Sequence, residues 1–170
     1  MKVRYIYICV LGLLMFLCND LFSQEAEFAM YRIKIKDKYL TYTTNNGNNN
    51  LVLEPLREGK NNISQCFLIK HGYKDAGWVN IFTAADPNKV MYILKGSGVN
   101  LGTYPTGLGN NVKLCLNGDG SYTIKNPDGS LAIRQYFNDN NLWLVETDKY
   151  PQFGDDVKKF TFEKVNPTKL

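Results

Sequence analysis

The chain has 170 residues, a formal net charge of +4 and a hydrophobic share of 44%. This length supports one hydrophobic core, so we expect a single domain. The small positive surplus is spread along the chain and does not form a basic stripe interleaved with aromatic residues. The composition therefore excludes the pattern that is typical of nucleic-acid binding.

Residues 1–23 have the layout of a secretory signal peptide. Lys2 and Arg4 give a basic start, residues 6–18 form an apolar run, and the small residue Ser23 ends the segment at the processing site that this layout predicts. An uncleaved membrane anchor is the alternative interpretation. The apolar run is well short of the ~20 residues that span a bilayer, so the chain is not expected to be membrane-spanning.

We therefore expect a cleaved signal peptide and a mature domain over residues 24–170, secreted to the periplasm or the extracellular space. Cys18 does not change this expectation. The bulky residues before it differ from the small residues that precede a lipid-modified cysteine.

Three successive segments of the mature chain resemble one another, at about 31–77, 78–120 and 121–165. The period is about 46 residues, within the range that indicates a repeat architecture. The opening triplets are Tyr31-Arg32-Ile33, Val79-Asn80-Ile81 and Tyr122-Thr123-Ile124. The apolar positions that follow are Leu40, Leu53 and Phe67, then Met91, Leu101 and Leu114, then Leu131, Leu144 and Phe160.

Each segment is predicted to form four short strands. Apolar and polar residues alternate, as over residues 31–36, and the mature chain offers no long run of helical periodicity. Turn dipeptides separate the strands at Asn46-Gly47, Asn117-Gly118, Asp119-Gly120 and Asp128-Gly129. Three repeats of four strands predict an all-β protein with pseudo-threefold symmetry, a β-trefoil, because closing the sheet removes its exposed edges.

Two cysteines, Cys66 and Cys115, remain after the predicted processing. An oxidising compartment permits a disulfide between them, and they lie close to equivalent positions of two repeats. Because the two strands come from different repeats, the sequence does not fix their separation. A disulfide and a pair of isolated, partly buried thiols therefore both stay open.

The sequence offers little for catalysis. The mature chain has one histidine, His71, which we place in the linker between the first two repeats, and it cannot be combined with a nucleophile and an acid. No cluster of His, Cys and carboxylates has metal-ligand spacing, and no glycine-rich loop has the phosphate-binding pattern. We therefore predict a non-enzymatic protein without a metal or another cofactor.

The layout of the repeats resembles the ricin B-type lectin domain family. The resemblance spans residues 31–165. It is best in the first repeat, where Gln65-Cys66-Phe67 is similar to the family's Gln-x-Trp motif with Phe in place of Trp. This resemblance implies a β-trefoil whose repeats each carry a shallow sugar pocket.

The family's sugar-binding positions are only partly kept. The position of its hydroxyl-binding Asp holds Thr41, Tyr92 and Ala132, that of its stacking aromatic holds Glu54, Gly102 and Val145, and that of its amide holds Ser64, Asn111 and Val157. The second repeat is the best candidate, with Tyr104 to stack and Asn100, Asn111 and Tyr92 to pair with hydroxyls. We expect glycans or glycoconjugates as partners, bound weakly at each site.

Two other functions remain open, because the fold alone does not determine function. A protease inhibitor would present a protruding loop, and the long loops over residues 102–111 and 146–157 have suitable lengths. A protein-interaction domain without any sugar site is the third hypothesis.

Overall fold

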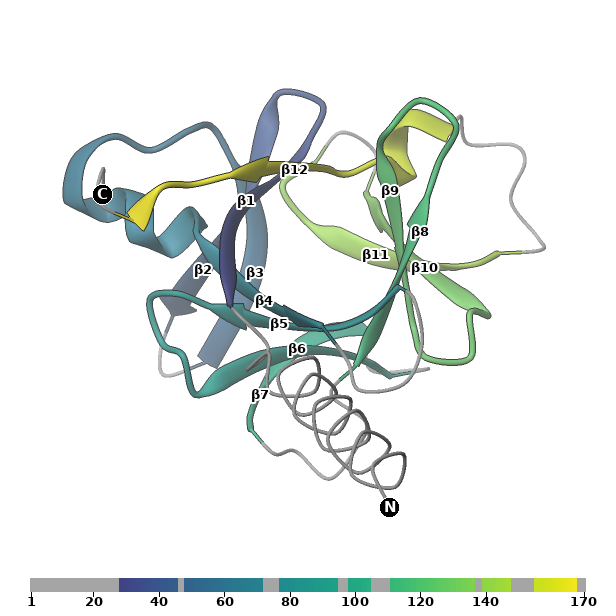
Figure 1. Cartoon of the computed structure of the whole chain (residues 1–170), viewed down its shortest axis with the longest axis horizontal. Coiled ribbons are helices and arrows are strands. Elements are labelled where there is room, and N and C mark those ends of the chain that lie inside the picture. The colour runs from purple at the N-terminus through teal and green to yellow at the C-terminus, as the bar shows by residue number, and fades with distance from the viewer. Residues whose placement is uncertain are drawn as a thin grey trace, which may run out of the picture.

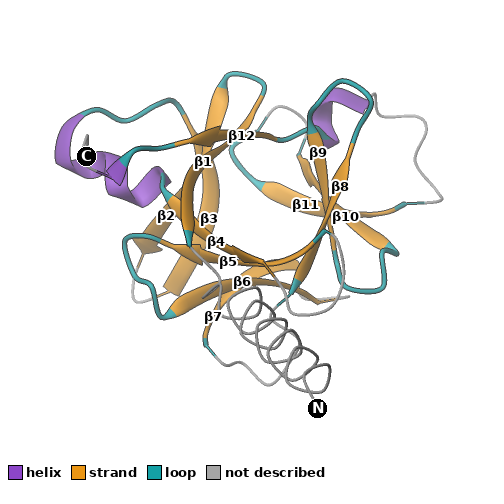
Figure 2. Cartoon of the chain, viewed as in Figure 1, coloured by secondary structure: helices purple, strands orange, loops and turns teal. Residues whose placement is uncertain are grey.

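The structure is a computed structural model, and it describes residues 28–45, 48–71, 77–94, 98–104, 111–136, 139–147 and 155–167. Strands make up most of these residues (Figure 2). The helical segments include two short 3-10 turns, η1 (Gly59–Gln65) and η3 (Asp155–Lys158). The predicted signal peptide lies outside the described residues.

Six strands form a closed barrel. They are β1 (Ala29–Ile35), β4 (Phe67–His71), β5 (Trp78–Thr83), β8 (Val112–Leu116), β9 (Tyr122–Lys125) and β12 (Thr161–Lys164). Each pairs antiparallel with the next in that order, the last of these contacts being the bridge between Tyr122 and Phe160. β12 then pairs with β1 and closes the ring (Figure 1).

Three hairpins cover the barrel. They consist of β2 (Lys38–Asn45) with β3 (Asn48–Glu54), β6 (Lys89–Leu94) with β7 (Gly98–Thr103), and β10 (Leu131–Gln135) with β11 (Leu142–Glu146). Each hairpin follows a barrel strand and pairs with it, and β3, β7 and β11 contact one another. A barrel of six strands capped by three hairpins is a β-trefoil, so the predicted fold class is confirmed.

One hydrophobic core fills the space between the barrel and the hairpins. The last residues of the opening triplets, Ile33, Ile81 and Ile124, are at most 1% exposed. Phe67 and Phe160 are also fully buried and belong to the same cluster, and Leu53, Leu101 and Leu144 pack in or against it. The alternation in the sequence therefore identified the inward faces of the strands.

Two of the predicted repeat registers are wrong by two residues. Leu40, Met91 and Ile133, not Leu131, lie opposite Leu53, Leu101 and Leu144. Phe67, Val112 and Phe160, with Val112 in place of Leu114, lie opposite Tyr31, Val79 and Tyr122. A slip of two residues leaves every side chain on the same face of its strand, so alternation cannot detect it.

Gly77 is required at the start of β5. Its φ is +96°, and a Cβ there would lie 2.8 Å from the carbonyl oxygen of Leu114. The backbone N–H of Leu114 donates to the Gly77 carbonyl at 2.7 Å, which holds β5 and β8 together at this end. Only glycine combines this left-handed conformation with such a close approach.

The two cysteines are free thiols in the structure. The Cys66 carbonyl accepts from the backbone N–H of Ala84 beyond one end of β5, whereas Leu114, next to Cys115, bonds to Gly77 at the other end. The length of β5 therefore separates them, and the candidate disulfide is not formed. Burial raises the pKa of the Cys66 thiol, and Arg32 acts in the opposite direction.

His71 is not in a linker, as the sequence suggested, but is the last residue of β4. It pairs with Val79 of β5. The strand therefore continues further toward the second repeat than the hydrophobic pattern indicates.

Replacing Phe67 or Phe160 by Ala is expected to lower the free energy of unfolding by about 3–5 kcal/mol, because each change leaves a cavity in the shared core. Urea unfolding followed by tryptophan fluorescence measures the effect. Leu56→Ala is the control, since Leu56 is 47% exposed and should cost little. Equal costs for the core and control variants would contradict the core assignment.

Candidate functional site

The second repeat brings two of the four predicted binding residues together. Tyr92 of β6 lies directly opposite Asn100 of β7. The Asn100 side chain donates to the Gly98 carbonyl at 3.2 Å, so part of its hydrogen-bonding capacity serves the hairpin itself. These two residues share one face of the β6–β7 hairpin.

The other two predicted residues are held by separate contacts. Tyr104 packs edge-on against Phe82, with ring centroids 5.3 Å apart, and is 48% exposed. Asn111 accepts a hydrogen bond of 2.8 Å from the Asn80 side chain. The corrected register also moves the family's amide position to residue 109, outside the described residues. The second-repeat site therefore stays a prediction.

In the first repeat, the side chains at the expected sugar-binding position contact one another. Gln65, from the Gln-x-Phe motif, is fully buried; its Nε2 donates to Thr41 Oγ1 and to the Pro55 carbonyl, and its Oε1 accepts from the Arg57 backbone. Arg57 pairs with Glu54 at 2.6 Å. These contacts occupy the groups that a sugar would otherwise use, so Gln65 has a structural role here.

A polar cavity of about 490 Å³ lies in the third repeat. Ligand sites in proteins have volumes of this order. The lining comes from the turn between β8 and β9, from β9 and β10, from the residue after β11, and from the segment that enters β12. It consists of Asn117, Gly118, Asp119, Thr123, Lys125, Ala132, Thr147, Lys158 and Lys159.

Asp119 is the centre of a hydrogen-bond network at the rim of this cavity. Its carboxylate accepts from the hydroxyl of Ser121 at 2.6 Å and pairs with Lys159 at 2.9 Å. Asn117 donates to Ser121 and accepts from Thr123 at 3.2 Å. The Ser121 hydroxyl, followed by Lys159, holds the pKa of the Asp119 carboxyl well below its usual range. The rim is therefore a pre-organised set of donors and acceptors.

Ala132 explains why this cavity exists. In the three repeats, the second residue of the hairpin pairs with the barrel strand, and it is Tyr39, Val90 and Ala132 in turn. Tyr39 fills this position in the first repeat, where it is 9% exposed. The small side chain of Ala132 leaves the corresponding space open in the third repeat.

An aromatic pair with one exposed ring lies on the same hairpin. Trp143 stacks on Tyr136 with ring centroids 4.4 Å apart and an interplanar angle of 19°, and it is 51% exposed. Trp143 lies opposite Arg134, and Val145 lies opposite the lining residue Ala132. Trp143 is therefore on the same hairpin face as Ala132, with its backbone about 7 Å along the strand from that of Val145. The sequence pattern singled out neither this pair nor the cavity lysines.

A second cavity, of about 430 Å³, is mostly apolar and lies among the barrel strands. Its lining includes Tyr31, Leu114, Tyr122 and Phe162. It offers few groups that could pair with a hydroxyl or a charge. The polar cavity of the third repeat is therefore the better candidate for a specific site.

Three further expectations concern inhibitor loops, metal sites and membrane-spanning helices. The tips of the loops considered for protease inhibition, residues 105–110 and 148–154, lie outside the described residues. Among the residues that the structure does describe, no group of three or more His, Cys, Asp and Glu side chains could hold a metal ion. Within the same ranges, no helix has the length and hydrophobicity needed to cross a membrane.

No protein-family model and no curated protein matches the chain. Among solved structures, a mosquitocidal holotoxin matches with a TM-score of 0.65 at 16% identity, covering 82% of this chain and 18% of the toxin. A GlcNAcα1-4Gal-releasing endo-β-galactosidase from Clostridium perfringens matches with a TM-score of 0.64 at 15% identity, covering 81% and 33%.

The C-half of an earthworm R-type lectin, solved in complex with GalNAc, matches with a TM-score of 0.54 at 13% identity, covering 81% of this chain and 99% of the lectin. The fold that the chain shares with this lectin is the β-trefoil. The resemblance to ricin B-type domains is thus confirmed for the fold. The chain spans a third or less of the toxin and of the glycosidase, so their activities say nothing further about it.

Replacing Gln65 by Ala is expected to lower the free energy of unfolding by about 2–4 kcal/mol, because Gln65 is fully buried and its three partners lose their hydrogen bonds at once. Ser64→Ala is the matched control, since Ser64 is the neighbour of Gln65, is only partly buried and accepts a hydrogen bond from the Arg57 side chain. Urea unfolding of both variants measures the difference. A Gln65→Ala variant as stable as the unchanged protein would refute the structural role.

Proposed function

We propose that this protein is a secreted, non-enzymatic carbohydrate-binding module whose principal site is the third repeat. The observation that carries the proposal is the juxtaposition of an open polar cavity with the exposed Trp143 ring on the β10–β11 hairpin. Amide, hydroxyl and carboxylate groups pair with sugar hydroxyls, and a flat ring stacks on the apolar face of a sugar.

Each part of the site has a defined task. Asp119 and Asn117 are held in place by their own network and offer their remaining hydrogen-bonding capacity to hydroxyls. Stacking on Tyr136 holds the Trp143 ring in one orientation, which lowers the conformational entropy lost on binding. A shallow, open site with one stacking ring binds weakly, on the order of millimolar, so useful avidity requires clustered glycans.

Replacing Trp143 by Ala is expected to weaken glycan binding at least tenfold, or about 1.4 kcal/mol, because the stacking surface is lost. Tyr104→Ala removes the exposed ring of the second repeat and is the matched control. Titration with glycans that are first identified on an array measures both. Loss of binding in Tyr104→Ala alone would move the site to the second repeat, and protease inhibition without any glycan binding would replace the proposal.

The export part of the proposal is supported by the basic start and short apolar run of residues 1–23. The full chain, expressed in a secretion-competent host, is expected to appear outside the cytoplasm with an N-terminus at or near residue 24. Mass spectrometry of the purified protein measures the cleavage. A full-length product retained in the cytoplasm would contradict it.

A further inference from the structure

We propose that the third-repeat cavity takes an acidic sugar, whose carboxylate or sulfate is held between Lys125 and Lys158. This inference rests on the carbohydrate-binding function proposed above and specifies the ligand class of that site. The starting observation is the charge of the lining, which contains three lysines and a single carboxylate, Asp119.

Asp119 already forms an ion pair with one of these lysines. Its carboxylate lies 2.9 Å from Lys159 Nζ and accepts two further hydrogen bonds from Ser121. Lys125 and Lys158 line the same cavity, so the charge of the lining remains positive after this pair is counted. An anionic oxygen group entering the cavity would lie in the field of both lysines.

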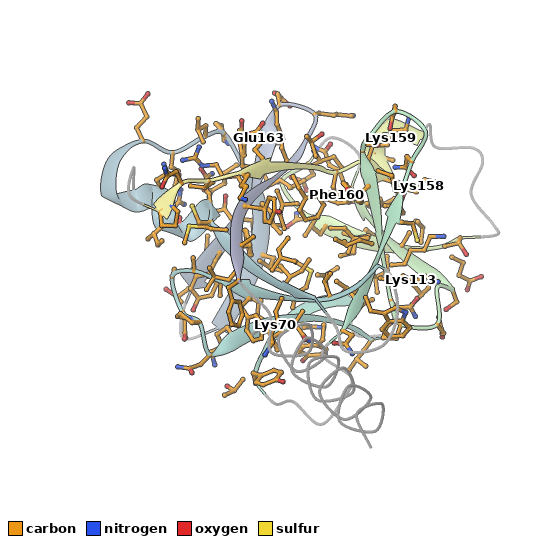
Figure 3. All side chains as sticks on the ribbon, viewed as in Figure 1. Lys70, Lys113, Lys158, Lys159, Phe160 and Glu163 are labelled. Carbon is orange, nitrogen blue, oxygen red and sulfur yellow. The ribbon has the colours of Figure 1, made fainter. Side chains whose placement is uncertain are left out.

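A fourth lysine strengthens the positive field. Lys113 of β8 lies directly opposite Lys125 of β9, and both point outward, because their neighbours Val112 and Ile124 are buried in the core. Figure 3 shows Lys158 and Lys159 beside the β8–β9 hairpin, with Phe160 turned inward. Like charges placed opposite one another are destabilising, and a binding site for an anion explains such an arrangement.

The other repeats show how this site differs. Lys34 is the first-repeat equivalent of Lys125, and it has partners within the protein: its Nζ lies 5.4 Å from the centroid of the Tyr39 ring and 3.8 Å from Glu163. In the third repeat the position of Tyr39 is taken by Ala132. The substitution removes the ring and opens space at the lysine.

The same comparison applies to Lys158. It stands two residues before the buried Phe160, as Gln65 stands two residues before the buried Phe67. Gln65 lies fully buried inside the first repeat, whereas Lys158 lines the cavity of the third. The third repeat has thus exchanged a ring and a neutral amide for open space and a cation, while the surrounding fold is unchanged.

Matched pairs of sugars test the proposal on the chain without residues 1–23. Galactose is compared with galacturonic acid, and N-acetylglucosamine with its 6-sulfate, by titration calorimetry. We expect the acidic member of at least one pair to bind about tenfold more tightly, and the two pairs show whether the carboxylate or the sulfate is preferred. Raising the salt concentration above ~0.15 M should weaken only the acidic member, because salt screens the lysines.

Lys125→Gln and Lys158→Gln are expected to remove this preference, so that the acidic member of the pair binds no more tightly than the neutral one. Lys89→Gln is the control, since Lys89 belongs to β6 and bonds to Thr103 away from the cavity. The urea midpoint of each variant shows whether it is folded. Equal binding of neutral and acidic sugars, still dependent on Trp143, would overturn this inference and leave the proposed function intact. Binding of neither member, together with no binding on the array, would overturn both.

Discussion

Closure of the barrel by β12 is the constraint on which the rest of the structure depends. The strand pairs with β1 along four residues, and Phe160, directly before it, exchanges two backbone hydrogen bonds of 2.8 Å with Tyr122. Without this return of the chain, β1 and β9 would present unpaired edges. Closure also fixes the position of Phe160 in the core and carries the segment before it across the third repeat.

A closed pseudo-threefold frame allows each repeat to diverge without a change of fold. The frame requires buried residues at the inward positions, and Ile33, Ile81 and Ile124 meet this need equally. The outward positions next to the hairpins are less constrained. There the first repeat is packed with Gln65 and its partners, whereas the third repeat, with Ala132, is open. Such outward positions are where a site can arise on a common fold.

The charged residues of the third repeat also occupy outward positions, and they come from different elements of the frame. Lys125 comes from a barrel strand, Asp119 from a turn, and Lys158 and Lys159 from the segment that leads into β12. The turn is held by local chemistry: Gly120 has a φ of +82°, and its N–H donates to the Asn117 carbonyl at 3.1 Å. The backbone of the strand, of the turn and of the returning segment is held separately in each case. The side chains that these elements carry therefore come together in a defined arrangement.

The sequence by itself determined the strands, their inward faces and the threefold plan, because alternation and turn dipeptides are local signals. Only the tertiary structure decided which residues are equivalent, since the two-residue slips at Ile133 and Val112 keep the same faces. It also decided the candidate site. Lys125 and Lys158 are far apart along the chain and line one cavity because the barrel closes, and the space beside Ala132 depends on what the surrounding residues leave unfilled.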